Sequence, residues 1–438
     1  MQELGRQNTA RASQHLLIAR CCTVGFSLLL TMILTRLIKP AELGNWFLIF
    51  SGAITVGTLI GMGLPFWVGR EASSWRTTRN GSFSPLVAGA SLRMLVIFLG
   101  AYCLNALVRT QARSIVPAFW LDFGSTILVI AGMAAPSALL CQVIRGMGRP
   151  VAGIWFEVMP TISLILCLLL WVATRSGAPS ATDVGALYCI GLILAMTSCV
   201  FFLSNGRHCM GVSARPATDR GKRPLLSAAW PIGLNELVSR ISAQMDLWIA
   251  AWYLSPQTVA IYGLATRAAM IALLMQNASR GLLQSDVPYL STNNDPREMR
   301  KLVLRAAKAN FLFSIAVVIG FAAAGQWAIE VAFGSDYTDA WDVCLILLTG
   351  RAIATFLGPN QLLLSLTGHQ RQLLLLTATG ILLLLPLLLL ATSWFGVYGT
   401  ATAIASFTIC QSLATAIQAR KHLGFWSCGW VGARSPPC

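Results

Sequence analysis

Residues 373–392 read LLLLTATGILLLLPLLLLAT, which is an unbroken run of apolar and small residues without one charged side chain. The hydrocarbon core of a bilayer is about 30 Å thick, and an α-helix of about 20 residues crosses it. This stretch is therefore predicted to be a membrane-spanning helix.

The rest of the chain follows the same pattern. Of its 438 residues, 56% are hydrophobic and only 11% are charged, and the mean hydropathy is +0.67. A soluble domain usually carries about 25% charged residues. Eleven further apolar stretches are long enough to span a membrane: 16–38, 43–68, 86–108, 117–143, 150–174, 183–204, 226–251, 256–280, 308–329, 341–366 and 397–419. We predict an all-α polytopic membrane protein with about 12 transmembrane helices.

The basic residues predict the topology. The chain has 32 Lys and Arg against 16 Asp and Glu, a net charge of +16. If the N-terminus is inside, the inner segments hold 24 of these cations, the outer segments 5 and the spans 3. Cytoplasmic loops collect Lys and Arg, so both termini are predicted to be cytoplasmic. Basic and aromatic residues do not alternate as in nucleic-acid-binding proteins, and we expect no nucleic-acid partner.

The two halves of the chain resemble each other. The segment after the first span begins at Pro40 and the segment after the seventh begins at Pro256, an offset of 216 residues, close to half of 438. In both, an aliphatic residue follows at the third position, a small one at the fourth and an aromatic one at the sixth. We predict a six-helix lobe at 1–204, a cytoplasmic linker at 205–224 and a second six-helix lobe at 225–438 with a short cytoplasmic tail. Transporters built from such repeats bind substrate between the halves.

The seventh span carries a wide polar stripe. Asn235, Ser239, Ser242 and Asp246 share one helical face, and Glu236, Arg240 and Gln244 form the adjoining row. A charge near the bilayer centre costs at least about 2.5 kcal/mol. This helix is therefore predicted to line water or other protein. The alternative for Glu236 and Arg240 is a purely structural ion pair between successive turns.

Other ionisable residues also fall within spans. Arg267 lies in the eighth span, Arg351 in the tenth and Glu157 in the fifth, and Glu157 is predicted to line the cavity. Together with Arg240 this gives three deeply placed Arg and few acids. A guanidinium matches phosphate with a fork of donors, so the pattern favours an anionic substrate. An internal partner such as Asp246 is an equally good reading for any one of these Arg.

The familiar catalytic and metal-binding motifs are missing from the sequence. It contains no Gly-x-x-x-x-Gly-Lys-Ser/Thr loop, no His-Glu-x-x-His, no Gly-x-Ser-x-Gly and no Cys-x-x-Cys, and its four His are scattered. We expect no enzymatic activity, no cofactor and no metal site. Residues 297–308 alternate basic and apolar residues at helical spacing and are predicted to lie on the inner leaflet ahead of the ninth span.

Several ordered motifs resemble one known family. They are residues 36–44 (RLIKPAELG), 61–64 (GMGL), 231–249 (PIGLNELVSRISAQMDLWI), 262–267 (YGLATR), 367–371 (TGHQR) and 395–401 (FGVYGTA). In their order and spacing the chain resembles the polysaccharide (O-antigen type) flippases of the multidrug/oligosaccharidyl-lipid/polysaccharide exporter superfamily.

The resemblance implies a fold, a substrate and partners. It implies two six-helix lobes around a central cavity, in a bacterial inner membrane. It implies flipping of undecaprenyl-pyrophosphate-linked oligosaccharide to the outer leaflet by alternating access, with a polysaccharide polymerase and chain-length proteins as candidate partners besides membrane lipid. Arg240, Arg267 and Arg351 would hold the pyrophosphate, and Asn235, Gln244, Asn277, Asn360 and Gln361 would bond the sugars. Ion-coupled multidrug export ranks second, and a membrane-embedded sugar transferase or polymerase third.

Overall fold

The structure, a computed structural model, is helical throughout its described part. It describes residues 2–78, 84–111, 118–174, 177–205, 225–277, 279–280, 283, 287, 296–367, 369–423 and 426–427. No strand occurs among these residues. The elements are α1 (Gln2–Leu37), α2 (Pro40–Gly61), α3 (Leu64–Thr78), α4 (Ser84–Gln111), α5 (Ala118–Gly146), α6 (Pro150–Thr174), α7 (Ala181–Asn205), α8 (Leu225–Tyr253), α9 (Pro256–Ala269), η2 (Met270–Leu273), α11 (Pro296–Phe333), η3 (Ser335–Tyr337), α12 (Ala340–Phe356), α13 (Asn360–Leu366) and α14 (Gln370–Leu423).

The chain divides into two compact units. The N-terminal unit comprises residues 25–245, and the C-terminal unit comprises residues 1–24 and 246–438. The division falls within α1 and within α8, so each of these helices contributes to both units. Most of the predicted linker 205–224 lies outside the described residues, and the predicted lobe boundaries stay a prediction.

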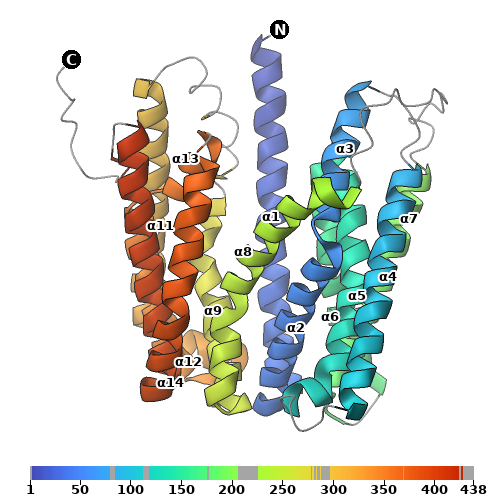
Figure 1. Ribbon diagram of the computed structural model, residues 1–438. Coiled ribbons are helices and arrows are strands. Elements are labelled where there is room, and N and C mark those ends of the chain that lie inside the picture. Colours follow the sequence, from blue (N-terminus) through green and yellow to red (C-terminus); the bar gives the residue numbers. More distant parts are fainter. Residues whose placement is uncertain are drawn as a thin grey trace. The chain divides into compact units, whose positions relative to one another are not determined.

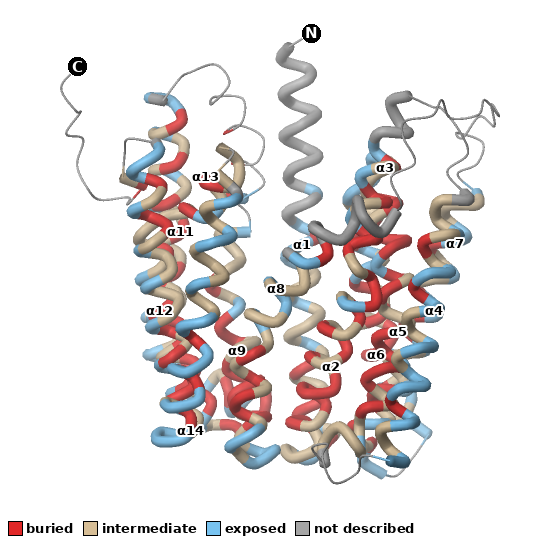
Figure 2. Tube along the Cα trace, in the orientation of Figure 1, coloured by how far each residue is buried: buried red, intermediate tan, exposed pale blue. Residues whose placement is uncertain are grey.

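Helix α5 is the centre of the N-terminal unit. It packs against α2, α3, α4, α6 and α7, and Figure 2 shows it buried along much of its length. Glycines permit the closest approach: a Cβ added at Gly146 would lie 2.1 Å from the carbonyl oxygen of Gly69 in α3. Small residues bring membrane helices together in this way. The outer helix α4 instead exposes Leu92, Leu95 and Val96, as a lipid-facing helix does.

Helix α12 has the corresponding central place in the C-terminal unit. It packs against α9, α11 and α14. Its Gly350 meets Ala405 of α14, where an added Cβ would lie 2.6 Å from the alanine Cβ. Helix α12 is the tenth predicted span and α5 the fourth, so the fourth span of each half is central.

Helix α14 is a helical hairpin. A straight helix of its 54 residues would be about 81 Å long, far beyond a bilayer core. At Gly396 the backbone takes φ 59° and ψ −135°, which ends one helix and begins another. The Thr392 and Thr400 hydroxyls then lie 2.9 Å apart across the turn, and the two arms run side by side in Figure 1. The predicted spans 372–394 and 397–419 are confirmed.

The described helices account for the predicted number of spans. Nine are long and apolar enough to cross a membrane, and the pair α12 and α13, bent by 48°, makes a tenth. The two arms of α14 count as one of the nine, so separating them gives eleven. The polar helix α8 is not apolar enough for this criterion, but its 29 residues are long enough for it to be the twelfth. The all-helical fold class with about 12 long helices is confirmed. The central cavity and the cytoplasmic termini stay predictions.

One expected helix boundary and one expected membrane contact are wrong. The stretch 43–68 is not one helix, because positive φ angles at Met62 and Gly63 (41° and 75°) separate α2 from α3. Residues 297–308 lead directly into the ninth span, but their apolar side chains do not lie on the inner leaflet as predicted. They are the first turns of the continuous helix α11, and their apolar side chains Met299 and Val303 pack against Leu363 of α13. Protein, not lipid, covers that apolar face.

The predicted repeat has matching local structure. Helix α2 begins at Pro40 and α9 begins at Pro256, each after an extended residue with φ near −65° and ψ near 150°. Proline is favoured in the first helical turn, where its missing N–H costs nothing. Helix α2 packs on α5 and α9 packs on α12, so the same pair of elements meets in both units.

Candidate functional site

A polar pocket of about 240 Å³ lies within the C-terminal unit. Four parts of the chain converge on it: the segment after α9, helix α11, the bent pair α12 and α13, and the second arm of α14. Its polar lining residues are Gln276, Ser279, Arg280, Asn310, Arg351, Asn360, Gln361, Thr408, Gln411, Ser412 and Thr415. We call it the C-unit pocket.

The bend between α12 and α13 shapes the floor of the pocket. Gly358 has φ 92°, a conformation that favours glycine, and a Cβ there would lie 2.7 Å from the carbonyl oxygen of Ser427. The buried amide of Asn360 donates to the carbonyl oxygen of Leu357 at 2.7 Å and accepts from the Ser427 hydroxyl. Asn360 therefore holds the bend in place, a structural use of a residue predicted to bind sugar.

A second hydrogen bond fixes two other polar side chains of the pocket. The Ser279 hydroxyl donates to Asn310 Oδ1 at 3.1 Å, and both side chains are buried. This leaves the Asn310 amide nitrogen as a donor on a pinned side chain. Gln361 is exposed, so its amide meets solvent at the pocket.

The C-unit pocket is positively charged. Arg280 and Arg351 both line it, and none of its described lining residues is Asp or Glu. Arg280 is exposed, whereas Arg351 is half-buried. Two guanidinium groups among amide and hydroxyl donors form a site for an anion that also carries hydroxyl groups.

Asp246, at the end of the predicted polar stripe, has an internal partner. The Tyr262 hydroxyl of α9 donates to Asp246 Oδ2 at 2.7 Å, and the Leu247 amide donates to Oδ1 at 2.9 Å. Tyr262 is fully buried. This hydrogen bond joins α8 to α9 inside the C-terminal unit. Asp246 therefore has a structural role.

Substitution of Tyr262 by Phe is expected to lower the free energy of unfolding by about 1–3 kcal/mol, because a half-buried carboxylate oxygen loses its donor. Thermal unfolding in detergent measures this. Tyr102→Phe is the matched control, because Tyr102 is exposed on α4 and its change should be neutral. Equal melting temperatures for Tyr262→Phe and the unmodified chain would contradict the assignment.

The remaining stripe residues lie in the N-terminal unit. Arg240 Nε donates to Glu236 Oε1 at 3.0 Å, so these two residues form the ion pair given above as the structural alternative. The Ser242 hydroxyl donates to the Val238 carbonyl, Ser239 is exposed and Gln244 is half-buried. The side chain of Asn235 lies outside the described residues.

Two further predicted residues lie in the C-terminal unit but are not among those that line the pocket. Arg267 donates to the carbonyl oxygen of Gly263, one turn earlier in α9, at 3.3 Å. Asn277 is exposed just after η2. Of the three predicted pyrophosphate-binding Arg, the structure thus places only Arg351 in the pocket.

Glu157 forms an ion pair in the N-terminal unit. Its carboxylate contacts the guanidinium of Arg145, twelve residues earlier, across the turn between α5 and α6. The two side chains are 47% and 20% exposed. The pair fastens two helices that a tight turn already holds together.

Replacing Glu157 by Gln is expected to lower the free energy of unfolding by up to about 1 kcal/mol, since half-exposed ion pairs contribute little. The exchanged pair Arg145→Glu with Glu157→Arg should recover most of this loss, and both variants should transport normally. Unfolding and transport measured on the same preparations test this. Loss of transport with unchanged stability would contradict this structural role and indicate that Glu157 lines the substrate path.

Arg280 was missed by the sequence reasoning, where it counted only as a topology signal at the inner end of the eighth span. Asn310, Gln276 and Gln411 were missed as well. Their signal is weak because a short polar set on one segment, such as Gln411 with Thr408 and Ser412, does not show which other segments it meets. Only the convergence of four distant segments makes them one site.

Comparison with known proteins identifies the family. The model of a family described as "Polysaccharide biosynthesis protein" matches residues 11–293, about two thirds of the chain. The chain belongs to this polysaccharide biosynthesis family. No curated protein sequence matches it.

Solved structures show the fold of this family member. An inward-facing multidrug resistance MATE family transporter of the MOP superfamily is 14% identical, with a TM-score of 0.71 over 93% of this chain and 98% of that one. An outward-facing MATE transporter is also 14% identical, with a TM-score of 0.66 and 95% of each chain covered. A MOP superfamily transporter from Pyrococcus furiosus, titled for the reverse polarity of its binding pocket, is 12% identical with a TM-score of 0.66 and the same coverage. The chain therefore has the fold of these transporters.

Proposed function

We propose that this protein flips a lipid-linked oligosaccharide, a repeat unit of a surface polysaccharide, from the cytoplasmic to the outer leaflet of a bacterial inner membrane. Its family takes part in polysaccharide biosynthesis, and its fold is that of membrane transporters. The substrate class follows from the undecaprenyl-pyrophosphate carrier that the sequence resemblance implies.

The observation that carries the proposal is the charge of the C-unit pocket. Arg280 and Arg351 line it, and none of its described lining residues is acidic, although Asp246 outside the lining interacts electrostatically with Arg351. Such a site attracts a pyrophosphate and repels a cation. Its amide and hydroxyl groups suit the sugar next to the pyrophosphate.

The size of the pocket agrees with a headgroup fragment. Pockets for drug-sized ligands have about 300–1,000 Å³, and this pocket has about 240 Å³. It accommodates the charged end of a larger ligand, while the prenyl tail stays in lipid. In the predicted topology, the inner ends of the eighth, ninth, tenth and twelfth spans meet at this pocket. The pocket would therefore lie on the side of the inner leaflet, from which the substrate would be taken.

Ion-coupled multidrug export is the second candidate, because the structural relatives include multidrug resistance transporters. A cationic drug requires a carboxylate in its site. Asp246 is a half-buried carboxylate of the C-terminal unit. Its oxygens already accept from Tyr262 and Leu247, and it interacts electrostatically with Arg351. This weighs against a cationic substrate there.

Deletion of the gene tests the proposal. Complete lipid-linked oligosaccharide should accumulate in the cytoplasmic leaflet, and surface polysaccharide should be lost. Unpolymerised units in the outer leaflet would contradict flipping and point to a polymerase. Unchanged glycolipid with increased drug sensitivity would support the drug exporter instead.

A further inference from the structure

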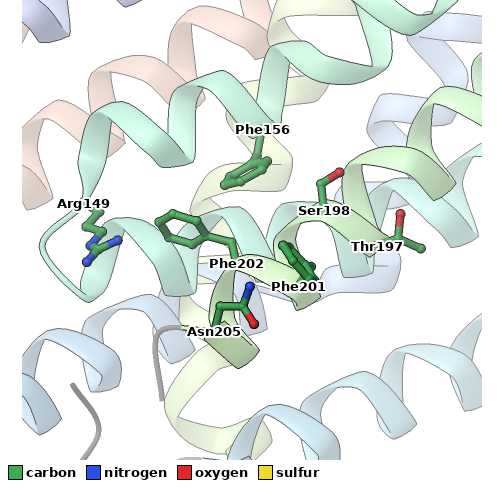
Figure 3. Close-up of a pocket in the computed structure, with 7 residues that line it drawn as sticks. All are labelled: Arg149, Phe156, Thr197, Ser198, Phe201, Phe202 and Asn205. Carbon is green, nitrogen blue, oxygen red and sulfur yellow. The ribbon is translucent and has the colours of Figure 1, made fainter. Parts of the chain in front are cut away.

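A second and larger pocket lies in the N-terminal unit, and none of its lining residues is used in the proposed function. It has a volume of about 630 Å³ and lies between the start of α6 and the end of α7. Figure 3 shows its lining residues: Arg149, Phe156, Thr197, Ser198, Phe201, Phe202 and Asn205. We call it the α6–α7 groove. Its lining combines one cation, three aromatic rings and three uncharged polar side chains.

Aromatic rings position the cation at one end of the groove. The Arg149 guanidinium carbon lies 5.1 Å from the centroid of the Phe202 ring, a cation–π contact. Phe156 packs edge-on against Phe202 with centroids 5.4 Å apart. In Figure 3 the Phe202 ring points toward Arg149. The guanidinium is thus held over the groove before any ligand arrives.

The charge of Arg149 is not neutralised within the described chain. No described carboxylate forms a salt bridge with Arg149, and the nearby Glu157 pairs with Arg145. Arg149 also directly precedes α6, which begins at Pro150. The positive end of the helix dipole therefore adds to its charge. This end of the groove favours an anion.

The remainder of the groove continues into a lipid-facing stripe. Ile190, Ile193, Leu194, Val200 and Phe201 are exposed along α7. Thr197 and Asn205 are exposed on the same helix, about 12 Å apart along its axis at 1.5 Å per residue. An occupant with its charged end at Arg149 and Asn205 would extend apolar chains along this stripe.

We propose that the α6–α7 groove binds a resident anionic phospholipid of the inner leaflet, independently of the transported substrate. Arg149 and the Asn205 amide hold the phosphate, and the acyl chains lie along Phe201 and the exposed face of α7. Both polar residues lie at the predicted cytoplasmic ends of their helices. Basic pockets between transmembrane helices on this side bind anionic headgroups, and a zwitterionic lipid brings its own cation into conflict with Arg149.

Native mass spectrometry of the purified full chain tests the proposal. Phosphatidylglycerol and phosphatidylcholine with identical acyl chains are offered to the unmodified chain, Arg149→Gln, Arg149→Lys and Arg93→Gln. Arg93 is the matched control, because it is exposed on α4 and also predicted to lie on the inner side. The unmodified chain should prefer phosphatidylglycerol about tenfold, the effect of one charge-assisted hydrogen bond.

Arg149→Gln should remove this preference, whereas Arg149→Lys and Arg93→Gln should retain most of it. Equal binding of the two lipids by the unmodified chain would overturn the proposal, and so would an unchanged preference in Arg149→Gln. Displacement of phosphatidylglycerol by undecaprenyl phosphate would also overturn it, because the groove would then serve the substrate. The unmodified chain and Arg149→Lys decide the matter even if Arg149→Gln does not fold.

Discussion

Replacing Arg280 and Arg351 together by Gln is expected to reduce oligosaccharide transport about hundredfold, and each single change about tenfold. Each guanidinium bonded to a phosphate contributes about 1.5–3 kcal/mol, and 1.4 kcal/mol is a factor of ten in affinity. The loss should fall on substrate binding, because the described lining of the C-unit pocket offers no other cation. Transport into the outer leaflet of vesicles at several substrate concentrations measures it.

The matched control is Arg371→Gln, which removes the same charge from an exposed position at the start of α14. It should transport normally. Arg351→Lys should recover only part of the activity, because an ammonium lacks the planar fork of donors. Thermal unfolding of each variant separates lost binding from lost fold. Normal transport by the folded double variant would exclude the C-unit pocket as the anion site.

Substitution of Gly399 by Ala is expected to have the largest effect on stability. A Cβ at this position would lie 1.8 Å from the carbonyl oxygen of Ala391 on the opposite arm of the α14 hairpin. The new Cβ is attached directly to one arm, and the Ala391 oxygen belongs to the backbone of the other. Neither atom can move away near the tight turn at Gly396 without opening the hairpin. We expect a loss of about 3 kcal/mol or more in the free energy of unfolding, at the upper end of overpacking effects.

Gly320→Ala is the control for this substitution. Gly320 is exposed on α11, and nothing lies within 4 Å of its added Cβ. Alanine there should be neutral or stabilise by up to about 1 kcal/mol, because it favours the helix. Melting temperatures of both variants in the same detergent provide the comparison. A stable Gly399→Ala protein would mean that the two arms do not meet at this turn.

The helices were predictable because one-dimensional signals determine them. Apolar length predicts the spans, and Pro40 and Pro256 mark where α2 and α9 begin. The spacing of Glu236 and Arg240 likewise predicts their ion pair, since residues four apart share a helical face. Hydropathy alone does not reveal the break at Met62 and Gly63. That break depends on backbone conformation within a stretch that is apolar throughout.

The site was only partly predictable because it depends on which helices meet. Arg351 was recognised as a charge inside an apolar span, which is costly unless it is used. Arg280 stands at a span end, where a basic residue is ordinary, so its part in the C-unit pocket had no local signal. Glu157 was misleading for the opposite reason. Its charge stands out in the sequence, but its partner Arg145 is brought to it by the turn between α5 and α6.

The central claim is that this protein carries an anionic glycolipid rather than a cationic drug, and reconstitution into vesicles tests it most directly. Purified protein is incorporated with undecaprenyl-pyrophosphate-linked oligosaccharide in one preparation and with a cationic dye in another. We predict protein-dependent appearance of the oligosaccharide in the opposite leaflet, lost in the Arg280 and Arg351 double variant, and no dye movement. Dye export driven by an ion gradient, without movement of the glycolipid, would contradict the account.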